Sequence, residues 1–107
     1  MQKRLSFIPL EAPVRGLRLV GELDMSSAHD LSDALTTMSG DSDLTLELSE
    51  LEFIDSSGLR AIVRYAGSLN GRGNLILANP STMTKRVFEI VRFAEHPKIV
   101  VEASNGE

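Results

Sequence analysis

Two serines follow a carboxylate in the segment Asp55-Ser56-Ser57-Gly58. A serine hydroxyl can accept a phosphoryl group, which adds about −1.5 to −2 charges at neutral pH. The same residue types also cap the first turn of a helix, where backbone N–H groups lack partners. Taken alone, the four residues are compatible with both uses, and capping is the more common one.

The flanking sequence places this group between a strand and a helix. Residues 44–54 are apolar and partly alternating, which is typical of a strand. Apolar residues then recur at helical spacing, at Leu59, Ile62, Val63, Ala66 and Leu69. We therefore expect a helix to begin near Ser56, where its dipole favours negative charge. A phosphate there would change a binding surface without refolding the domain.

Other acidic residues are expected at the same edge of the sheet. Glu22 and Asp24 end a preceding strand that we expect beside the one leading to Asp55. Three such carboxylates could bind Mg²⁺ or hold a proton. The alternative is that they are solvated strand-end acids, with Asp24 capping the next helix. His29 and His96 lack metal-ligand spacing, so we predict surface positions for both and no metal site.

Catalytic motifs are absent from the sequence. No Gly-x-Ser-x-Gly elbow surrounds the serines, and no Gly-x-x-x-x-Gly-Lys phosphate loop occurs. The chain also has no Cys, which excludes a thiol nucleophile and a disulfide framework. We predict a protein that is not an enzyme and needs no cofactor.

The composition fits one small domain over residues 1–107. The chain is 42% hydrophobic with a formal charge of −4, no Trp and one Tyr. This balance argues against nucleic acid as a partner. No signal peptide and no membrane-spanning run are recognisable, so we expect a cytoplasmic protein without membrane insertion.

The periodicity predicts an α/β fold with the order β-β-α-β-α-β-α-β. Strands are expected at residues 5–10, 17–23, 44–48, 74–78 and 99–101. Pro9 confines the first strand to an edge. Residues 44–48 alternate, so we expect a mixed sheet with its helices mainly on one face. Residues 75–77 are continuously apolar, so the open face is not uniformly polar.

Two further helices are expected outside the central one. Ser27 and Asp30 resemble a capping box at the start of the first, which Gly40 should end. Its buried face should carry Ala28, Leu31, Leu35 and Met38. The last helix should bury a stripe formed by Met83, Val87, Ile90 and Val91.

Two motifs together resemble a known family. Gly21-Glu22-Leu23-Asp24, followed later by Leu51-x-Phe53-Ile54 and Asp55-Ser56-Ser57-Gly58-Leu59, is similar to the STAS domain. That family includes bacterial anti-anti-sigma factors and the cytosolic domain of sulphate transporters. The similarity extends from the first strand to the last and includes residues 85–90. Residues 103–107 are too short and polar to supply the helix with which the family usually ends.

The length of the chain looks most like the anti-sigma factor antagonist branch. This resemblance implies that the unphosphorylated domain binds an anti-sigma factor that is also a serine kinase, which frees a sigma factor. The domain would thereby regulate bacterial transcription, as in a stress response. The kinase would phosphorylate Ser56, and a metal-dependent serine phosphatase would reset it.

The resemblance also implies roles for neighbouring residues. Asp24 and Asp55 match acidic positions beside the phosphorylation site and are candidates for contact with the kinase. Ser57 and Gly58 match positions that shape the same loop. Arg60, beyond the motif, is either part of a partner surface or a solvated helix residue.

Two alternatives remain open from the sequence. One is a receiver domain with Asp55 as the phosphate acceptor, although no acidic pair follows the first strand. The other is a STAS scaffold, or a module that binds a small ligand, without a phosphorylation switch.

Overall fold

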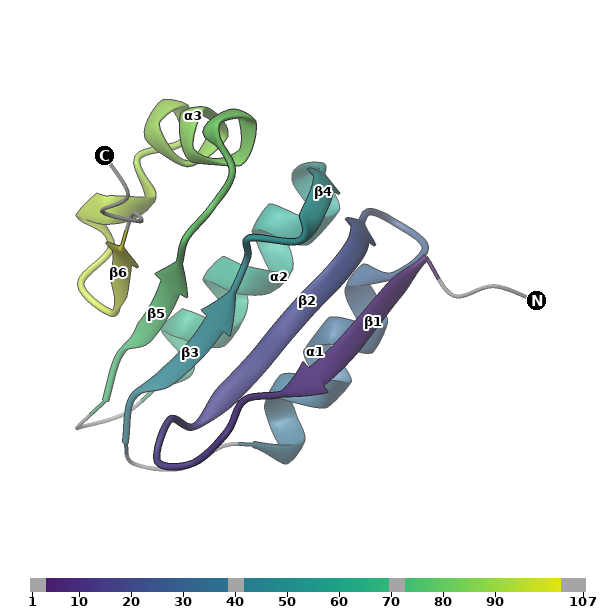
Figure 1. The fold of residues 1–107 in the computed structure, drawn as a ribbon. Coiled ribbons are helices and arrows are strands. Elements are labelled where there is room, and N and C mark those ends of the chain that lie inside the picture. Colours follow the sequence, from purple (N-terminus) through teal and green to yellow (C-terminus); the bar gives the residue numbers. More distant parts are fainter. Residues whose placement is uncertain (1–3, 39–41, 70–72, 103–107) are drawn as a thin grey trace.

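The chain folds into a mixed sheet that carries helices on one face (Figure 1). The structure is a computed structural model that describes residues 4–38, 42–69 and 73–102. Its strands are β1 (Leu5–Pro9), β2 (Gly16–Leu23), β3 (Leu44–Glu47), β4 (Leu51–Ile54), β5 (Leu75–Ala78) and β6 (Ile99–Glu102). Its helices are α1 (Ala28–Thr37), α2 (Ser56–Gly67), α3 (Thr82–Ile90) and the short 3₁₀ helix η1 (Phe93–Glu95).

The structure confirms the mixed sheet and the edge position of the first strand, and it adds one strand, β4, to the expected order of elements. The strand order is β1-β2-β3-β5-β6, and β4 pairs with β2 beyond the end of β3. β1 is antiparallel to β2, whereas the other strands pair in parallel. Pro9 therefore lies in an edge strand, where its missing N–H disrupts no pairing.

The apolar segment over residues 44–54 forms two strands, β3 and β4, where the sequence predicts one strand over residues 44–48. Leu44, Leu46 and Leu48 point to the core at even positions, and Leu51 is buried at an odd one. A continuous strand cannot bury both sets on one face, because its side chains alternate strictly. A turn between β3 and β4 allows all four leucines to be buried. In this turn the Leu51 N–H donates to the Leu48 carbonyl at 3.1 Å.

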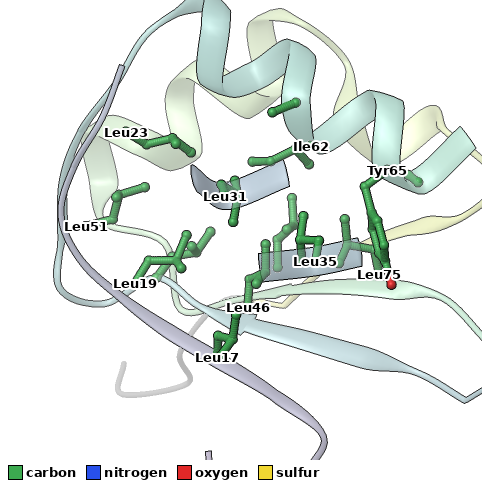
Figure 2. Packing of buried hydrophobic residues seen from close by; sticks show 14 of the residues in the cluster. Leu17, Leu19, Leu23, Leu31, Leu35, Leu46, Leu51, Ile62, Tyr65 and Leu75 are labelled. Carbon is green, nitrogen blue, oxygen red and sulfur yellow. The ribbon is translucent and has the colours of Figure 1, made fainter. Parts of the chain in front are cut away.

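One face of the sheet is packed and the other is open, as the alternating strands predict. In Figure 1, α1 and α2 lie together behind the strands. Figure 2 shows strand leucines such as Leu19 and Leu46 packed with Leu31, Leu35 and Ile62 of these helices, and all five are fully buried. Side chains at the alternate strand positions, such as those of Thr45, Glu47 and Ile76, are only half-buried.

The start of α1 differs from the expected capping box. Ser27 precedes the helix, but its side chain caps no N–H of α1. Its hydroxyl instead donates to the Glu22 carbonyl at 2.8 Å and accepts from the Asp24 N–H at 2.9 Å. Ser27 therefore closes the turn between β2 and α1. The helix ends at Thr37, and Gly40 lies outside the described residues.

The expected buried stripe of α3 is wrong. Met83 and Ile90 are 68% and 72% exposed, whereas Thr84 and Phe88 are the buried residues of the helix. The reason is position, since α3 lies beyond the end of β5 and not across the sheet (Figure 1). Its main apolar partner is η1, where the Phe93 ring stacks on Phe88 with centroids 5.0 Å apart.

In α2 the buried face is rotated slightly from the expected one. Ile62 and Ala66 are buried as predicted, but Val63 is exposed and Tyr65 is buried in its place. The Tyr65 ring lies along the core beside α1 and β5 (Figure 2). None of the described helices is long and apolar enough to cross a membrane.

Neighbouring residues of β5 test the one-sided sheet. We expect Leu77→Ala to lower the free energy of unfolding by about 2–5 kcal/mol, because Leu77 is fully buried against the helices. Ile76→Ala, on the open face, should cost less than half as much. Urea unfolding of both variants measures the difference. Equal losses in the free energy of unfolding would mean that both faces of the sheet are covered.

Candidate functional site

Two parallel strands end together and bring the acidic residues to one edge of the sheet. Leu23 of β2 is the register partner of Ile54 of β4. The pairing continues one step further, since the Asp55 N–H donates to the Leu23 carbonyl at 3.1 Å. Asp24 and Asp55 therefore follow neighbouring strands at the same edge, as the sequence predicts.

The side chain of Asp55 caps α2. Its Oδ1 accepts the N–H of Ser57 at 2.9 Å and that of Gly58 at 3.2 Å. Its backbone carbonyl accepts the N–H of Leu59 at 3.0 Å, which closes the first helical turn. Of the two uses that the sequence left open for this segment, capping belongs to Asp55 and not to either serine.

The two serines differ in accessibility. Ser56 is the first residue of α2 and is exposed, whereas Ser57 is half-buried. Within the described residues neither hydroxyl makes a hydrogen bond. Ser56 therefore presents a hydroxyl that no described contact requires for folding.

Gly58 lets the first turn of α2 sit directly on the strand ends. A Cβ at this position would lie 2.6 Å from Leu23 Cγ and 3.0 Å from Ile54 Cγ1. The distance to Leu23 is shorter than real Cβ contacts, so any larger residue would have to displace that buried side chain. The close approach sets the position of Ser56 relative to the loop that carries Asp24.

Arg4 holds the Asp24 loop, and nothing in the sequence pattern pointed to it. Its guanidinium donates to Asp24 Oδ2 at 2.8 Å and to Glu22 Oε1 at 2.5 Å. Asp24 Oδ1 also accepts the N–H and the hydroxyl of Ser26 at 2.9 and 2.7 Å. The hydrogen bonds from Ser26 and then from Arg4 lower the pKa of Asp24 to about 2.

These contacts disfavour the Mg²⁺ interpretation of the three carboxylates. Arg4 binds Glu22 and Asp24, while the Asp55 carboxylate is bound by its own helix. Among the described residues, no group of three His, Asp or Glu side chains could hold a metal ion. What the arrangement offers is an exposed hydroxyl beside fixed acidic groups.

A shallow hollow adjoins Ser57 between the amino-terminal ends of α1 and α2. Its volume is about 270 Å³, and Met25, Ser57, Arg60 and Arg64 are among its lining residues. Both arginines are exposed, as expected for a polar helix face. Larger hollows lie on the open sheet face and between α3 and β6, and none of the predicted site residues lines them.

Exposed apolar side chains flank the site, and sequence reasoning gave them no role. Met25 is 80% exposed directly after Asp24, and Phe53 is 45% exposed two residues before Asp55. Strand alternation would place Phe53 on the same face as buried Leu51, two residues earlier, so the sequence carried no signal for its exposure. The pairing of β4 with β2 shifts register between Gly21 and Glu22, and this irregularity interrupts the alternation between the two residues. Apolar side chains that stand this open beside polar groups are typical of contact surfaces.

Comparison with known proteins identifies the fold. A family model described as "Mlab, STAS domain" matches residues 10–102. An anti-sigma factor antagonist from Mycobacterium paratuberculosis has a similar structure, with a TM-score of 0.72, 20% identity, and coverage of 90% of this chain and 85% of that chain. The anti-sigma factor antagonist SpoIIAA in its unphosphorylated form gives a TM-score of 0.56 and 23% identity, over 90% of this chain and 86% of that chain.

The two glycines of α2 provide a matched test of the packing. Gly58→Ala should lower the free energy of unfolding by about 1–3 kcal/mol, because the new methyl group overlaps Leu23 and Ile54. Gly67→Ala, with no atom within 4 Å of its Cβ, should raise it by up to about 1 kcal/mol through helix propensity. Denaturant unfolding measures both. A stabilising Gly58→Ala would contradict the close packing.

The lowered pKa of Asp24 predicts an acid-sensitive loop. A carboxylate with a lowered pKa in the folded state stabilises the fold above its unfolded pKa, and the benefit is lost as the pH falls through the folded value. Asp24→Asn should therefore be less stable than wild type at pH 7, and the gap should close between about pH 4 and pH 2. Thermal unfolding across this range measures the gap.

Glu52→Gln is the control for that experiment. Glu52 is exposed, and its carboxylate makes no hydrogen bond or ion pair within the described ranges. Its substitution should leave stability nearly unchanged across the same pH range. If Asp24→Asn behaves like this control, the contacts from Arg4 and Ser26 contribute nothing to the loop.

Proposed function

The chain belongs to the STAS domain family, and on that premise we propose that it is an anti-sigma factor antagonist that phosphorylation of Ser56 switches off. In this role the unphosphorylated domain binds an anti-sigma factor that is also a serine kinase. Binding frees a sigma factor, so the domain regulates bacterial transcription from the cytoplasm without being an enzyme itself.

One observation carries the proposal: Ser56 is exposed at the start of α2 while Asp55 does the capping. A hydroxyl that is accessible and unused can be modified without loss of a structural contact. The helix dipole also favours a phosphate on this first residue. The similarity in fold to two anti-sigma factor antagonists supports the same role.

Phosphorylation would act through charge and bulk at the contact surface. The kinase would transfer the γ-phosphoryl group of ATP to Ser56 Oγ, with release of ADP and the hydroxyl proton. The dianionic product would stand beside the carboxylate of Asp55, in a surface that also exposes Met25 and Phe53. A partner that packs on these apolar groups would then meet a bulky, hydrated charge. A metal-dependent phosphatase would hydrolyse the ester and restore binding.

We assign roles in the cycle of phosphorylation and dephosphorylation to the residues around Ser56. Asp24, fixed by Arg4, and Asp55, fixed by its own helix, would present oriented acidic groups to the kinase. Ser57 and Gly58 would hold the backbone of the loop, with Gly58 against Leu23. Arg60 would extend the contact surface along α2.

A second candidate function is a STAS scaffold that binds its partner without a phosphorylation switch. The description of the matching family, which names Mlab and not an anti-sigma factor antagonist, favours keeping it. We do not propose a receiver domain, because the Asp55 carboxylate already accepts two backbone N–H groups. Phosphorylation of Asp55 would remove this cap.

Phosphorylation of Ser56 is directly testable with a partner protein obtained by co-purification from the native host. Incubation with this partner and ATP should add one phosphate to wild type and to Ser57→Ala, and none to Ser56→Ala. Intact-protein mass spectrometry measures the modification. Phosphate on wild type that persists in Ser56→Ala would refute the assignment.

Binding of the same partner separates the two candidate functions. Ser56→Asp should weaken binding at least about tenfold if a negative charge at this position disrupts the contact. Ser56→Ala, which adds no charge, is the control and should bind like wild type. Isothermal titration measures both. Equal affinity of Ser56→Asp and wild type would favour the scaffold.

A further inference from the structure

We propose that Arg60 is the intramolecular partner of the phosphate on Ser56, so that the phosphorylated state is held by an ion pair along one face of α2. This inference rests on the proposed function for its biological meaning. It concerns a residue just beyond the motif that carries the family resemblance. It assigns to Arg60 a role in regulation, in addition to a place on the contact surface.

The first argument is the register of the helix. Ser56 and Arg60 both belong to α2, four positions apart. Side chains at this spacing are neighbours on the helix surface, with Cβ atoms about 5–6 Å apart. Helical side chains also lean toward the amino terminus, so the long side chain of Arg60 extends over the turn that contains Ser56.

The second argument is that three backbone N–H groups of the first turn already have acceptors. The N–H groups of Ser57 and Gly58 already donate to the Asp55 carboxylate, and that of Leu59 donates to the Asp55 carbonyl. A phosphate on Ser56 would therefore meet a carboxylate and few free donors at the start of the helix. A cation from a side chain would offset the repulsion from the carboxylate and add to the effect of the helix dipole.

The third argument is the availability of Arg60. Its side chain is exposed, and within the described ranges it takes part in no hydrogen bond or ion pair. Arg4, by contrast, is committed to Glu22 and Asp24. Arg64 is a further turn along α2, about 12 Å from Ser56 along the helix axis.

The hollow beside the site places Arg60 next to the amino-terminal turn of α2. Ser57 and Arg60 line the same depression, so the guanidinium and the amino-terminal turn share one local surface. Ser56 does not line this hollow itself, but both Ser56 and Arg60 are exposed, so the guanidinium can approach the modified serine from the solvent side. Its planar donors match phosphate oxygens in a bidentate way that lysine does not.

The test installs phosphoserine at position 56 during translation, so that no kinase is needed. Phosphorus NMR then measures the second acid dissociation constant of the phosphate. In the wild-type background this constant should be about two- to threefold larger than with Arg60→Ala, because the guanidinium stabilises the dianion. The difference should shrink in 1 M NaCl, which screens exposed charges.

Arg64→Ala is the matched control, since it removes the same group two turns away from Ser56. It should leave the dissociation constant at the wild-type value. Equal values for wild type and Arg60→Ala would overturn the pair, and so would an equal effect of both arginines, which would indicate only the general field of the helix.

Thermal unfolding provides a second measurement of the same contact. Arg60→Ala should lower the melting temperature of the phosphorylated protein more than that of the unmodified protein. Equal shifts would again overturn the pair. A kinase that leaves Ser56 unmodified would refute the proposed function but not the pair, because the phosphate is introduced independently.

Discussion

The site depends on the parallel pairing of β2 with β4, which makes the two strands end at the same point. Leu23 and Ile54 are register partners, so Asp24 and Asp55 leave the sheet side by side. The first turn of α2 then packs on these two side chains, so closely that a Cβ at Gly58 would overlap Leu23. Any shift in this packing would move Ser56 relative to Asp24, because both residues are positioned by the carboxyl ends of β2 and β4.

In the first turn of α2, one residue stabilises the helix and its neighbour remains available for modification. A helix start needs an acceptor for its unpaired N–H groups, and Asp55 provides it. Ser56 follows without a structural task and remains exposed. The same arrangement explains why a phosphate on Ser56 would find its nearest compensation in a side chain of the next turn and not in the backbone.

Fixed acidic groups give the surface its character. Arg4 crosses from the start of β1 to hold Glu22 and Asp24, and it thereby ties the edge of the sheet to the loop before α1. Around these groups Met25 and Phe53 remain exposed. A surface that combines oriented carboxylates with exposed apolar side chains suits a protein partner better than a small ligand, because each hollow nearby is shallow and open.

The sequence by itself determined what depends on local pattern: every α-helix and every strand of the order except β4, the one-sided sheet, and Asp55-Ser56-Ser57-Gly58 at a strand-to-helix junction. Periodicity and capping preferences act over a few residues and can therefore be recognised in the sequence. It could not assign the cap among Asp55, Ser56 and Ser57, since each residue type can fill that position. Only the tertiary structure decided the break between Leu48 and Leu51, the exposure of Met83 and Ile90, and the contact of Arg4 with Asp24. These features depend on which element lies opposite, and contacts between distant parts of the chain leave no periodic trace in the sequence.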